Sequence, residues 1–267
     1  MSLWKTIFAT GKPIIGMVHV QALPGTPKST LRQEEITEIA VREALLYEKC
    51  GLDAILLENM HDVPYLNRDA GPEIIAAMTA VSVAVRKAVK FPIGIQILAG
   101  ANREALAVAL AAGLQFIRAE GFVYGHIADE GYMDSCAGEL LRYRKSIGAE
   151  HIALLTDIKK KHSAHSITSD VSLGETASAA EFFLSDGLII TGTATGKEVR
   201  LDDLTETKQH TALPVLLGSG ITAENIAKYW SLADGFIIGS HFKKEGIWSN
   251  PLSELLISKF MKKVTQL

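Results

Sequence analysis

Cysteine is scarce in this chain, and its scarcity excludes two kinds of architecture. Only Cys50 and Cys136 occur among the 267 residues. Two cysteines cannot form a disulfide framework or a cysteine-rich metal site, because both need more thiols. The fold must therefore be held together by its hydrophobic core, and a reducing compartment suits the chain.

Long apolar runs and a surplus of one charge are missing as well. No run approaches the roughly 18 apolar residues of a membrane span, and no charged stretch with an apolar signal core opens the sequence. The formal net charge is −3, and lysine and arginine do not gather into a long patch. These absences argue against a membrane span and a nucleic-acid surface, and they predict a cytoplasmic protein.

Apolar residues make up 48% of the sequence and form eight runs rich in branched side chains, with helical patterns between them. Continuous rather than alternating apolar runs are typical of parallel strands that are covered on both faces. The length is too short for two ordinary domains with full cores. We therefore predict a single (β/α)8 TIM-barrel domain over residues 1–267. Its strands are expected at 13–18, 53–58, 92–98, 115–120, 151–157, 187–191, 214–217 and 235–238.

The predicted loops differ in length at the two ends of this barrel. Links from helix to strand are short, as at 50–52 and 112–114, whereas links from strand to helix are long, as at 121–136 and 158–171. In a barrel every strand-to-helix loop opens on the same end, where barrel enzymes keep their sites. The loop lengths thus place the functional site at the carboxyl ends of the strands.

Residues 213–240 contain two strand-to-helix turns in succession, and both predicted strands end on glycine. Glycine lets bare backbone approach a ligand, so N–H groups at a turn or helix start can converge on an anion. We expect a helix to start at Thr222 and the small-residue loop 191–196 to lie beside these turns. This pattern favours a phosphate site, although glycines that only make tight turns have the same pattern. The predicted phosphate-binding residues are Gly192, Gly218, Ser219, Gly220, Gly239 and Ser240.

Ionisable residues stand where several predicted strands end, which places them at the mouth of the barrel. Glu58 and Glu120 end the second and fourth strands, and we expect them to face one cavity. Two carboxylates in a partly dry pocket push one pKa up, which suits an acid and base pair. The alternative is an ion pair, in which Glu120 neutralises Arg118 or another cation. The predicted catalytic residues are His19, Glu58, Glu120, Asp157, Lys161 and His162.

The fifth strand-to-helix loop combines Asp157 with the run Lys159, Lys160, Lys161 and His162. Lysine can bind phosphate, act as a base or form a Schiff base, and histidine can transfer protons near neutral pH. A charge run is also typical of a solvated loop, so we expect at most one or two of the three lysines to reach the site. No metal-binding spacing of histidines is present, so no metal ligands are predicted, although a divalent metal stays open.

Stretches of sequence, spread in order along nearly the whole chain, match the motifs of one protein family. They are IIGMVHVQALPG, LLENMHDVPYL followed by GPEIIAAM, GELLRYRKSIGA, TDIKKKHS, ITGTATG, LLGSGITAENI and ADGFIIGSHFKKEGIWSNP. Together they resemble the BtpA family, which is named after a photosystem I biogenesis protein and includes SgcQ-like bacterial proteins. The resemblance implies a TIM barrel and a role in photosystem I accumulation in cyanobacteria, with relatives in organisms that have no photosystem. It places His19, Glu58, Asp157, Lys161 and His162 on motif positions of the family.

Two functions fit these observations. The first is an enzyme that acts on a small phosphorylated metabolite, such as a sugar phosphate or nucleotide, by acid-base or lyase-type chemistry. The second is a non-catalytic ligand-binding or assembly factor. The enzyme is favoured because a scaffold has no use for several carboxylates that face a shared cavity. We expect a small phosphorylated ligand and no obligatory cofactor, while homo-oligomerisation stays open.

Overall fold

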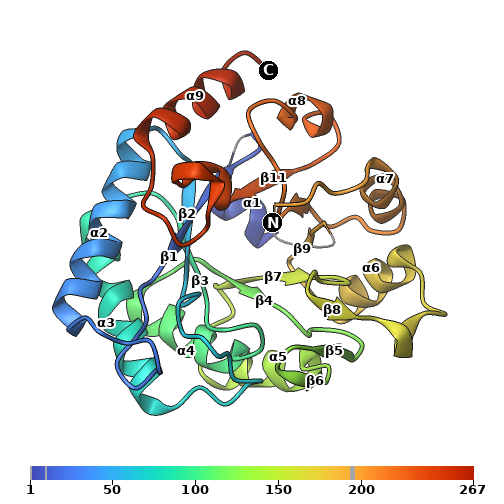
Figure 1. The fold of residues 1–267 in the computed structure, drawn as a ribbon. Coiled ribbons are helices and arrows are strands. Elements are labelled where there is room, and N and C mark those ends of the chain that lie inside the picture. Colours follow the sequence, from blue (N-terminus) through green and yellow to red (C-terminus); the bar gives the residue numbers. More distant parts are fainter. Residues whose placement is uncertain (1, 10, 193–195) are drawn as a thin grey trace.

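Eight parallel strands close into a barrel in the computed structural model, which describes residues 2–9, 11–192 and 196–267 (Figure 1). The strands follow one another around the ring in chain order, and the last pairs with the first. Each apolar run expected from the sequence forms one of these strands, so the predicted (β/α)8 TIM barrel is confirmed. The barrel strands are β1 (Ile14–His19), β2 (Ala54–Glu58), β3 (Ile93–Gln96), β4 (Phe116–Ala119), β7 (Ala153–Asp157), β9 (Gly187–Ile190), β10 (Val215–Leu217) and β11 (Gly235–Ile238).

Helices surround the barrel and cover the outer faces of its strands (Figure 1). Their apolar residues recur at intervals of three and four, which gives each helix one buried stripe, as with Ile36, Ala40, Ala44 and Tyr47 in the first of them. The surrounding helices are α2 (Gln33–Lys49), α3 (Pro72–Ala88), α4 (Asn102–Ala112), α5 (Ala137–Ser146), α6 (Leu173–Phe182), α7 (Leu201–Gln209), α8 (Ile226–Tyr229) and α9 (Glu254–Val264).

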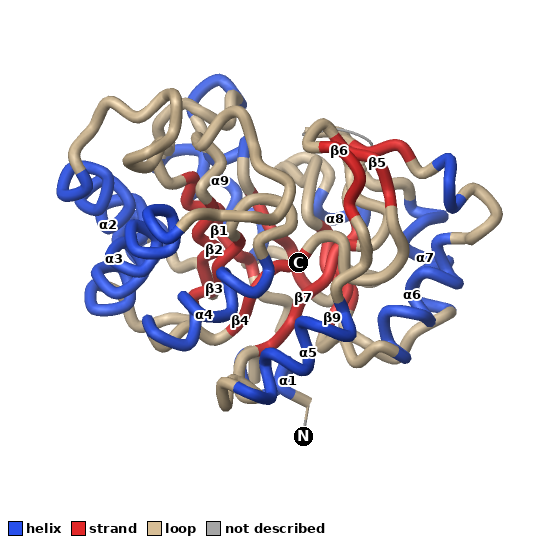
Figure 2. Tube along the Cα trace, turned by 90° about the horizontal axis from the view of Figure 1, so that it is seen from below, coloured by secondary structure: helices blue, strands red, loops and turns tan. Residues whose placement is uncertain are grey.

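A short N-terminal helix, α1 (Leu3–Ile7), lies at the amino end of the barrel (Figure 2). Its Trp4 and the following Phe8 are buried in the same apolar cluster as the inward-facing strand residues. The ring centroids of Trp4 and Phe8 are 4.6 Å apart, and those of Phe8 and Phe116 are 5.9 Å apart. The amino end is therefore filled with apolar side chains, which leaves the carboxyl end for polar ligands.

A small antiparallel sheet lies at the carboxyl end, on the side opposite α1 (Figure 2). It joins β5 (His126–Ala128) and β6 (Gly131–Met133) to β8 (Ser163–Ala164). The sequence predicted irregular loops at these positions, because strands of two or three residues carry no recognisable period. The sheet ties the loop after β4 to the loop after β7. Three single-turn helices complete the loops: η1 (Ser166–Thr168), η2 (Ser240–Phe242) and η3 (Lys244–Gly246).

Candidate functional site

A cavity of about 600 Å³ opens at the carboxyl end of the barrel. Its polar walls follow from strand alternation: Ala54 and Leu56 point into the barrel core, so Glu58, two residues further on, points into the mouth. All predicted site residues except Asp157 and Gly192 line the cavity. Those that line it are His19, Glu58, Glu120, Lys161, His162, Gly218, Ser219, Gly220, Gly239 and Ser240.

The residues at the ends of β10 and β11 line this cavity. Among the residues that the structure describes, the N–H groups of Ser219, Gly220, Gly239 and Ser240 donate to no other protein group. Gly220 has φ +69°, and a Cβ there would lie 2.2 Å from the carbonyl oxygen of Lys197, so only glycine fits. Unsatisfied amides that converge on a polar cavity are suited to bind an anion.

The helix expected at Thr222 does not start there, and this part of the prediction was wrong. The helix α8 begins at Ile226 and contains four residues. The Thr222 amide donates to Asn225 Oδ1 at 2.8 Å, and the Ala223 amide donates to His241 Nε2 at 3.2 Å. Both amides therefore already have acceptors, so neither Thr222 nor Ala223 offers a free N–H group to an anion.

Gly192 lies outside the lining of the cavity, contrary to the sequence-based expectation for a phosphate-binding residue. Its amide donates to Ser219 Oγ at 2.7 Å, and that hydroxyl in turn donates to the Lys197 carbonyl oxygen at 3.3 Å. Because the Gly192 amide already has an acceptor, this residue holds the β10 turn in place and does not offer an N–H group to a ligand. Thr193, Ala194 and Thr195 of the same predicted loop lie outside the described residues.

Four buried charged residues form what we call the ion-pair cluster: Arg118, Glu120, Asp157 and Lys160. Arg118 donates to both carboxylate oxygens of Asp157, at 2.7 Å from Nε and 2.8 Å from Nη2. Lys160 Nζ lies 2.8 Å from Glu120 Oε2, and Arg118 Nη2 lies 3.9 Å from Glu120 Oε1. The ion pair predicted as an alternative for Glu120 is thus present, with Lys160 as the nearer cation. Asp157 is turned toward Arg118 and lines a separate space of about 20 Å³.

Glu58 and Glu120 have pKa values shifted in opposite directions. Burial raises the pKa of Glu58 above its ordinary value, and Arg118 opposes this effect only in part. Burial also acts to raise the pKa of Glu120, but Lys160 and Arg118 outweigh it and leave that pKa below its ordinary value. No hydrogen-bond partner for the Glu58 carboxyl occurs within the described part of the chain. Two carboxyls whose pKa values are driven apart are suited to separate acid and base roles.

The three consecutive lysines have three different environments. Lys159 donates to the backbone carbonyl oxygens of Val171 and Thr168, so it stabilises its own loop. Lys160 belongs to the ion-pair cluster, and Lys161 lines the cavity, where burial and the nearby Arg118 lower its pKa. Two of the three lysines therefore reach the cavity, within the limit expected from the sequence.

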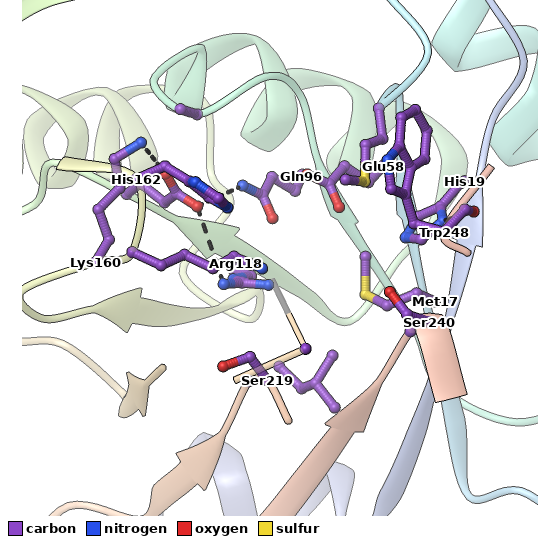
Figure 3. A pocket seen from close by; sticks show the side chains of 18 of the residues that line it. Met17, His19, Glu58, Gln96, Arg118, Lys160, His162, Ser219, Ser240 and Trp248 are labelled. Carbon is purple, nitrogen blue, oxygen red and sulfur yellow. Dashed lines mark hydrogen bonds and ion pairs between the residues drawn. The ribbon is translucent and has the colours of Figure 1, made fainter. Parts of the chain in front are cut away.

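The backbone of this loop is held in an uncommon conformation. Lys159 and His162 have φ values of 45° and 54°, in the left-handed region that few residues other than glycine adopt. The Lys161 amide donates to Thr191 Oγ1 at 3.1 Å, which fastens the loop to the end of β9. Lys160 and His162 lie on one wall of the cavity (Figure 3), and Lys161 lines the cavity as well.

His19 is held as a neutral base. Its Nδ1 lies 3.0 Å from the carbonyl oxygen of Trp248, which can only accept, so Nδ1 carries the proton and Nε2 has the free lone pair. Burial, together with the smaller effect of the Lys243 charge, lowers the pKa of His19 to about 3. Figure 3 shows His19, Glu58 and Trp248 on one side of the cavity and Lys160 and Arg118 on the other.

Sequence reasoning missed Gln96, Lys160 and Trp248 as parts of the site. Gln96 is 2% exposed, ends β3, and lies in register with Glu58. The alternation that places Glu58 in the mouth also places Gln96 there, so the sequence did contain a signal for it. Trp248 comes from the segment after η3, and no local pattern brings it to β1.

A metal-binding cluster and a membrane-spanning helix are both absent from the described residues. No group of three or more His, Cys, Asp and Glu side chains there could hold a metal ion. None of the described helices combines the length and the apolar character needed to cross a membrane. Cys50 and Cys136 are both free thiols.

Solved barrels share this fold at low sequence identity. The chain superposes on thiamine phosphate pyrophosphorylase from Pyrococcus furiosus with a TM-score of 0.57, at 15% identity and with 96% of each chain covered. It superposes on N-(5'-phosphoribosyl)anthranilate isomerase from the same organism with a TM-score of 0.56, at 13% identity, covering 96% of this chain and all of that one. These similarities support the barrel architecture.

Sequence comparison is more specific. An uncharacterized mitochondrial protein of Caenorhabditis elegans is 52% identical over 264 residues, which cover 97% of this chain and 95% of that protein. The photosystem I biogenesis protein BtpA of Synechocystis is 32% identical over 267 residues, which cover 100% of this chain and 92% of that protein. A family model described as the BtpA family matches residues 10–266. The chain therefore belongs to the BtpA family.

Proposed function

We propose that this protein is an enzyme that acts on a small phosphorylated metabolite by acid-base chemistry of the isomerase or lyase type. One observation carries the proposal: a single cavity joins backbone amides that lack acceptors to a carboxyl, Glu58, that lacks a hydrogen-bond partner, as judged over the described residues. The cavity volume of about 600 Å³ suits a small molecule.

In this proposal the phosphate group binds to the amides of Ser219, Gly220, Gly239 and Ser240. Barrel enzymes commonly bind phosphate at the loops that follow their last two strands, which are β10 and β11 in this chain. The names of the two structural neighbours contain a thiamine phosphate and a phosphoribosyl compound, which agrees with a phosphorylated ligand.

Glu58 is our candidate for the group that transfers a proton. Its raised pKa brings it nearer to neutral pH, where one side chain can both accept and return a proton. Lys161, with its lowered pKa, supplies a nearby cation for charge that develops on the ligand, and His19 Nε2 offers a second acceptor. We assign Asp157 to positioning, because both of its oxygens are used to hold Arg118.

The phosphate site can be tested at Gly239. A Cβ there would lie 3.5 Å from Met17 and 3.7 Å from the His19 ring, so Gly239→Ala fits but narrows the cavity. Gly220 is a poor choice, because any side chain would collide with the Lys197 carbonyl oxygen.

Calorimetric titration with inorganic phosphate should show a loss of at least tenfold in affinity for Gly239→Ala. The control is Gly138→Ala, on the outer helix α5, which should bind phosphate like the natural protein. Equal phosphate affinity in all three proteins would argue that these glycines serve only the turns.

Catalysis can be tested with a panel of phosphorylated metabolites, with and without divalent cations. A raised melting temperature identifies ligands, because a ligand at 100 times its Kd adds about 2.7 kcal/mol of stability. Conversion of each ligand is then followed by phosphorus NMR. We expect Glu58→Gln to abolish conversion while it keeps the affinity for inorganic phosphate. Conversion that survives this substitution would remove Glu58 from the mechanism.

The assembly-factor alternative has one specific observation in its favour. Phe182, Phe183 and Leu184, at the end of α6, expose 79%, 45% and 68% of their surface, as partner-binding residues often do. The Synechocystis relative is named for photosystem I biogenesis. Replacing these three residues by serine in cells should leave function intact if the protein is an enzyme, whereas Glu58→Gln should abolish it. The opposite pair of results would favour the assembly factor.

We infer a reducing compartment for the protein, since its two thiols are unpaired. The cytosol and the mitochondrial matrix both satisfy this condition, and the Caenorhabditis elegans relative is named as mitochondrial. Fractionation of cells that express the tagged full chain distinguishes the two.

A further inference from the structure

Gln96 is a buried side chain with one half of its amide unused. It is 2% exposed, and its Nε2 donates to Glu120 Oε1 at 3.2 Å. Its Oε1 is buried and has no hydrogen-bond partner among the described residues. Glu120 fixes this orientation, because a carboxylate only accepts and must face the NH2 group of the amide. The carbonyl oxygen of Gln96 is therefore an acceptor that the protein leaves without a donor.

Toward β2 and β1, the neighbours of Gln96 are acceptors as well. Strand pairing sets His19 beside Glu58 and Glu58 beside Gln96, at the carboxyl ends of β1, β2 and β3. We call these three residues the acceptor row. His19 presents the lone pair of Nε2, and the Glu58 carboxyl has no partner among the described residues. Figure 3 shows Gln96 between Glu58 and the side chains of Arg118 and Lys160.

The acceptor row runs from the edge of the phosphate site to the opposite wall of the cavity: His19 borders Gly239, whereas Gln96 lies far from β10. In the closed ring, β3 is the fourth strand from β10 in either direction, so Gln96 faces the turn at Gly218 to Gly220 across the barrel mouth. A ligand held by its phosphate at β10 and β11 thus extends toward the row. Because acceptors repel carbonyl and carboxylate oxygens, the row requires hydrogen-bond donors on that part of the ligand.

We propose that Gln96 accepts a hydrogen bond from a hydroxyl group of the ligand, and that the substrate is a phosphorylated sugar or polyol. The proposal rests on the proposed function, because it assumes a phosphate at β10 and β11. Several neighbouring hydroxyls satisfy the Gln96 carbonyl, the Glu58 carboxyl and His19 Nε2 together. A ligand without such hydroxyls would leave these buried acceptors unpaired, which costs binding free energy.

The test compares three probes by calorimetry: inorganic phosphate, n-pentyl phosphate and ribitol 5-phosphate. The two organic phosphates have the same chain length and differ in hydroxyl groups. We expect the natural protein to bind ribitol 5-phosphate at least tenfold more tightly than pentyl phosphate. Equal or tighter binding of pentyl phosphate would overturn the inference while phosphate binding still supports the proposed function. Failure of all three probes to bind would overturn both.

Gln96→Met tests the side chain itself, because methionine keeps the size and removes the acceptor. We expect the preference for ribitol 5-phosphate to fall to threefold or less, with inorganic phosphate affinity and the melting temperature little changed. The control is Gln115→Met, the same replacement at the amino end of β4, where the Gln115 carbonyl accepts from the Ile93 amide. It should keep the full preference. A preference that survives in Gln96→Met overturns the assignment, and the probe comparison decides if that variant does not fold.

Discussion

The two sides of the cavity treat their polar groups in opposite ways. In the ion-pair cluster, every charged side chain has a partner within the protein, at 2.7 Å or 2.8 Å in the closest pairs. In the acceptor row, each residue keeps at least one atom without a partner in the described chain. Groups that are paired internally hold the shape of a site, whereas unpaired groups cost stability and are retained where a ligand completes them. The polar residues at the strand ends therefore fall into two groups: those that hold the site in shape and those that can contact a ligand.

We expect the largest change in stability from replacing Arg118, which contacts two carboxylates of the ion-pair cluster. Arg118→Met leaves the carboxylates of Asp157 and Glu120 buried with one cation fewer, so we expect unfolding to become easier by about 4 kcal/mol. Urea denaturation at pH 7 measures the change. Lys145→Met, which breaks the exposed pair with Glu150, serves as the control and should have little effect. A similar, small change in both variants would remove the supporting role of the cluster.

Replacement by glutamine should change the free energy of unfolding in opposite directions at Glu58 and Glu120, which tests the comparison directly. Glu120→Gln removes the partner of Lys160, and we expect a loss of about 3 kcal/mol at pH 7. Glu58→Gln removes a carboxyl that is costly to ionise, and we expect a gain of about 1 kcal/mol. Denaturation curves of both variants, measured beside the natural protein, decide the signs.

The pH dependence of these two effects should also differ. The pKa of Glu120 is lowered by folding, so its contribution to stability is present above 4.5 and is lost as the pH falls through the folded value. The pKa of Glu58 is raised, so its cost grows as the pH rises above 4.5, where the unfolded state ionises first, and is complete once the carboxyl has also ionised in the folded state. The gain from Glu58→Gln should therefore vanish in acid. A gain that is independent of pH would contradict this origin.

The smallest expected effect concerns protonation of His19. With its pKa lowered to about 3, the ring should stay neutral with its proton on Nδ1 throughout the range from pH 4 to 8. Nitrogen NMR of labelled histidine should show a neutral ring, protonated on Nδ1, that does not titrate in this range, and that signal should disappear in His19→Gln. Since the folded pKa lies below the ordinary 6.5, His19 contributes stability above that pH and loses it as the pH falls toward 3. Titration of that signal near pH 6 would show an open, solvated ring.

The strands, the barrel and the mouth as the place of the site could be predicted, because they depend on local periods. Eight continuous apolar runs predicted the strands, and the polar residues at the ends of several runs indicated the mouth of the barrel. The ion pairs between charged side chains could not be predicted in the same way. Nothing in the run of three lysines tells which one contacts Glu120, since the choice depends on how the loop after β7 folds against β4.

Other errors came from treating residue types singly. Thr222 suggested a helix start, but α8 begins only at Ile226, and side chains accept from the Thr222 and Ala223 amides. Gln96 was overlooked because it is not ionisable, although its place at the end of β3 is equivalent to that of Glu58. A search of the inward-facing position at every strand end, whatever its residue type, would have found it.

The N-terminal helix α1 limits the route by which a ligand can reach the cavity. Because Trp4 and Phe8 close the amino end, a ligand enters and leaves the cavity at the same end, through the loops of the mouth. In the enzyme that we propose, product would have to leave by that route before the next substrate could enter. Turnover of the proposed enzyme would then depend on the segment that carries Trp248, whose ring lies beside His19 and lines the cavity.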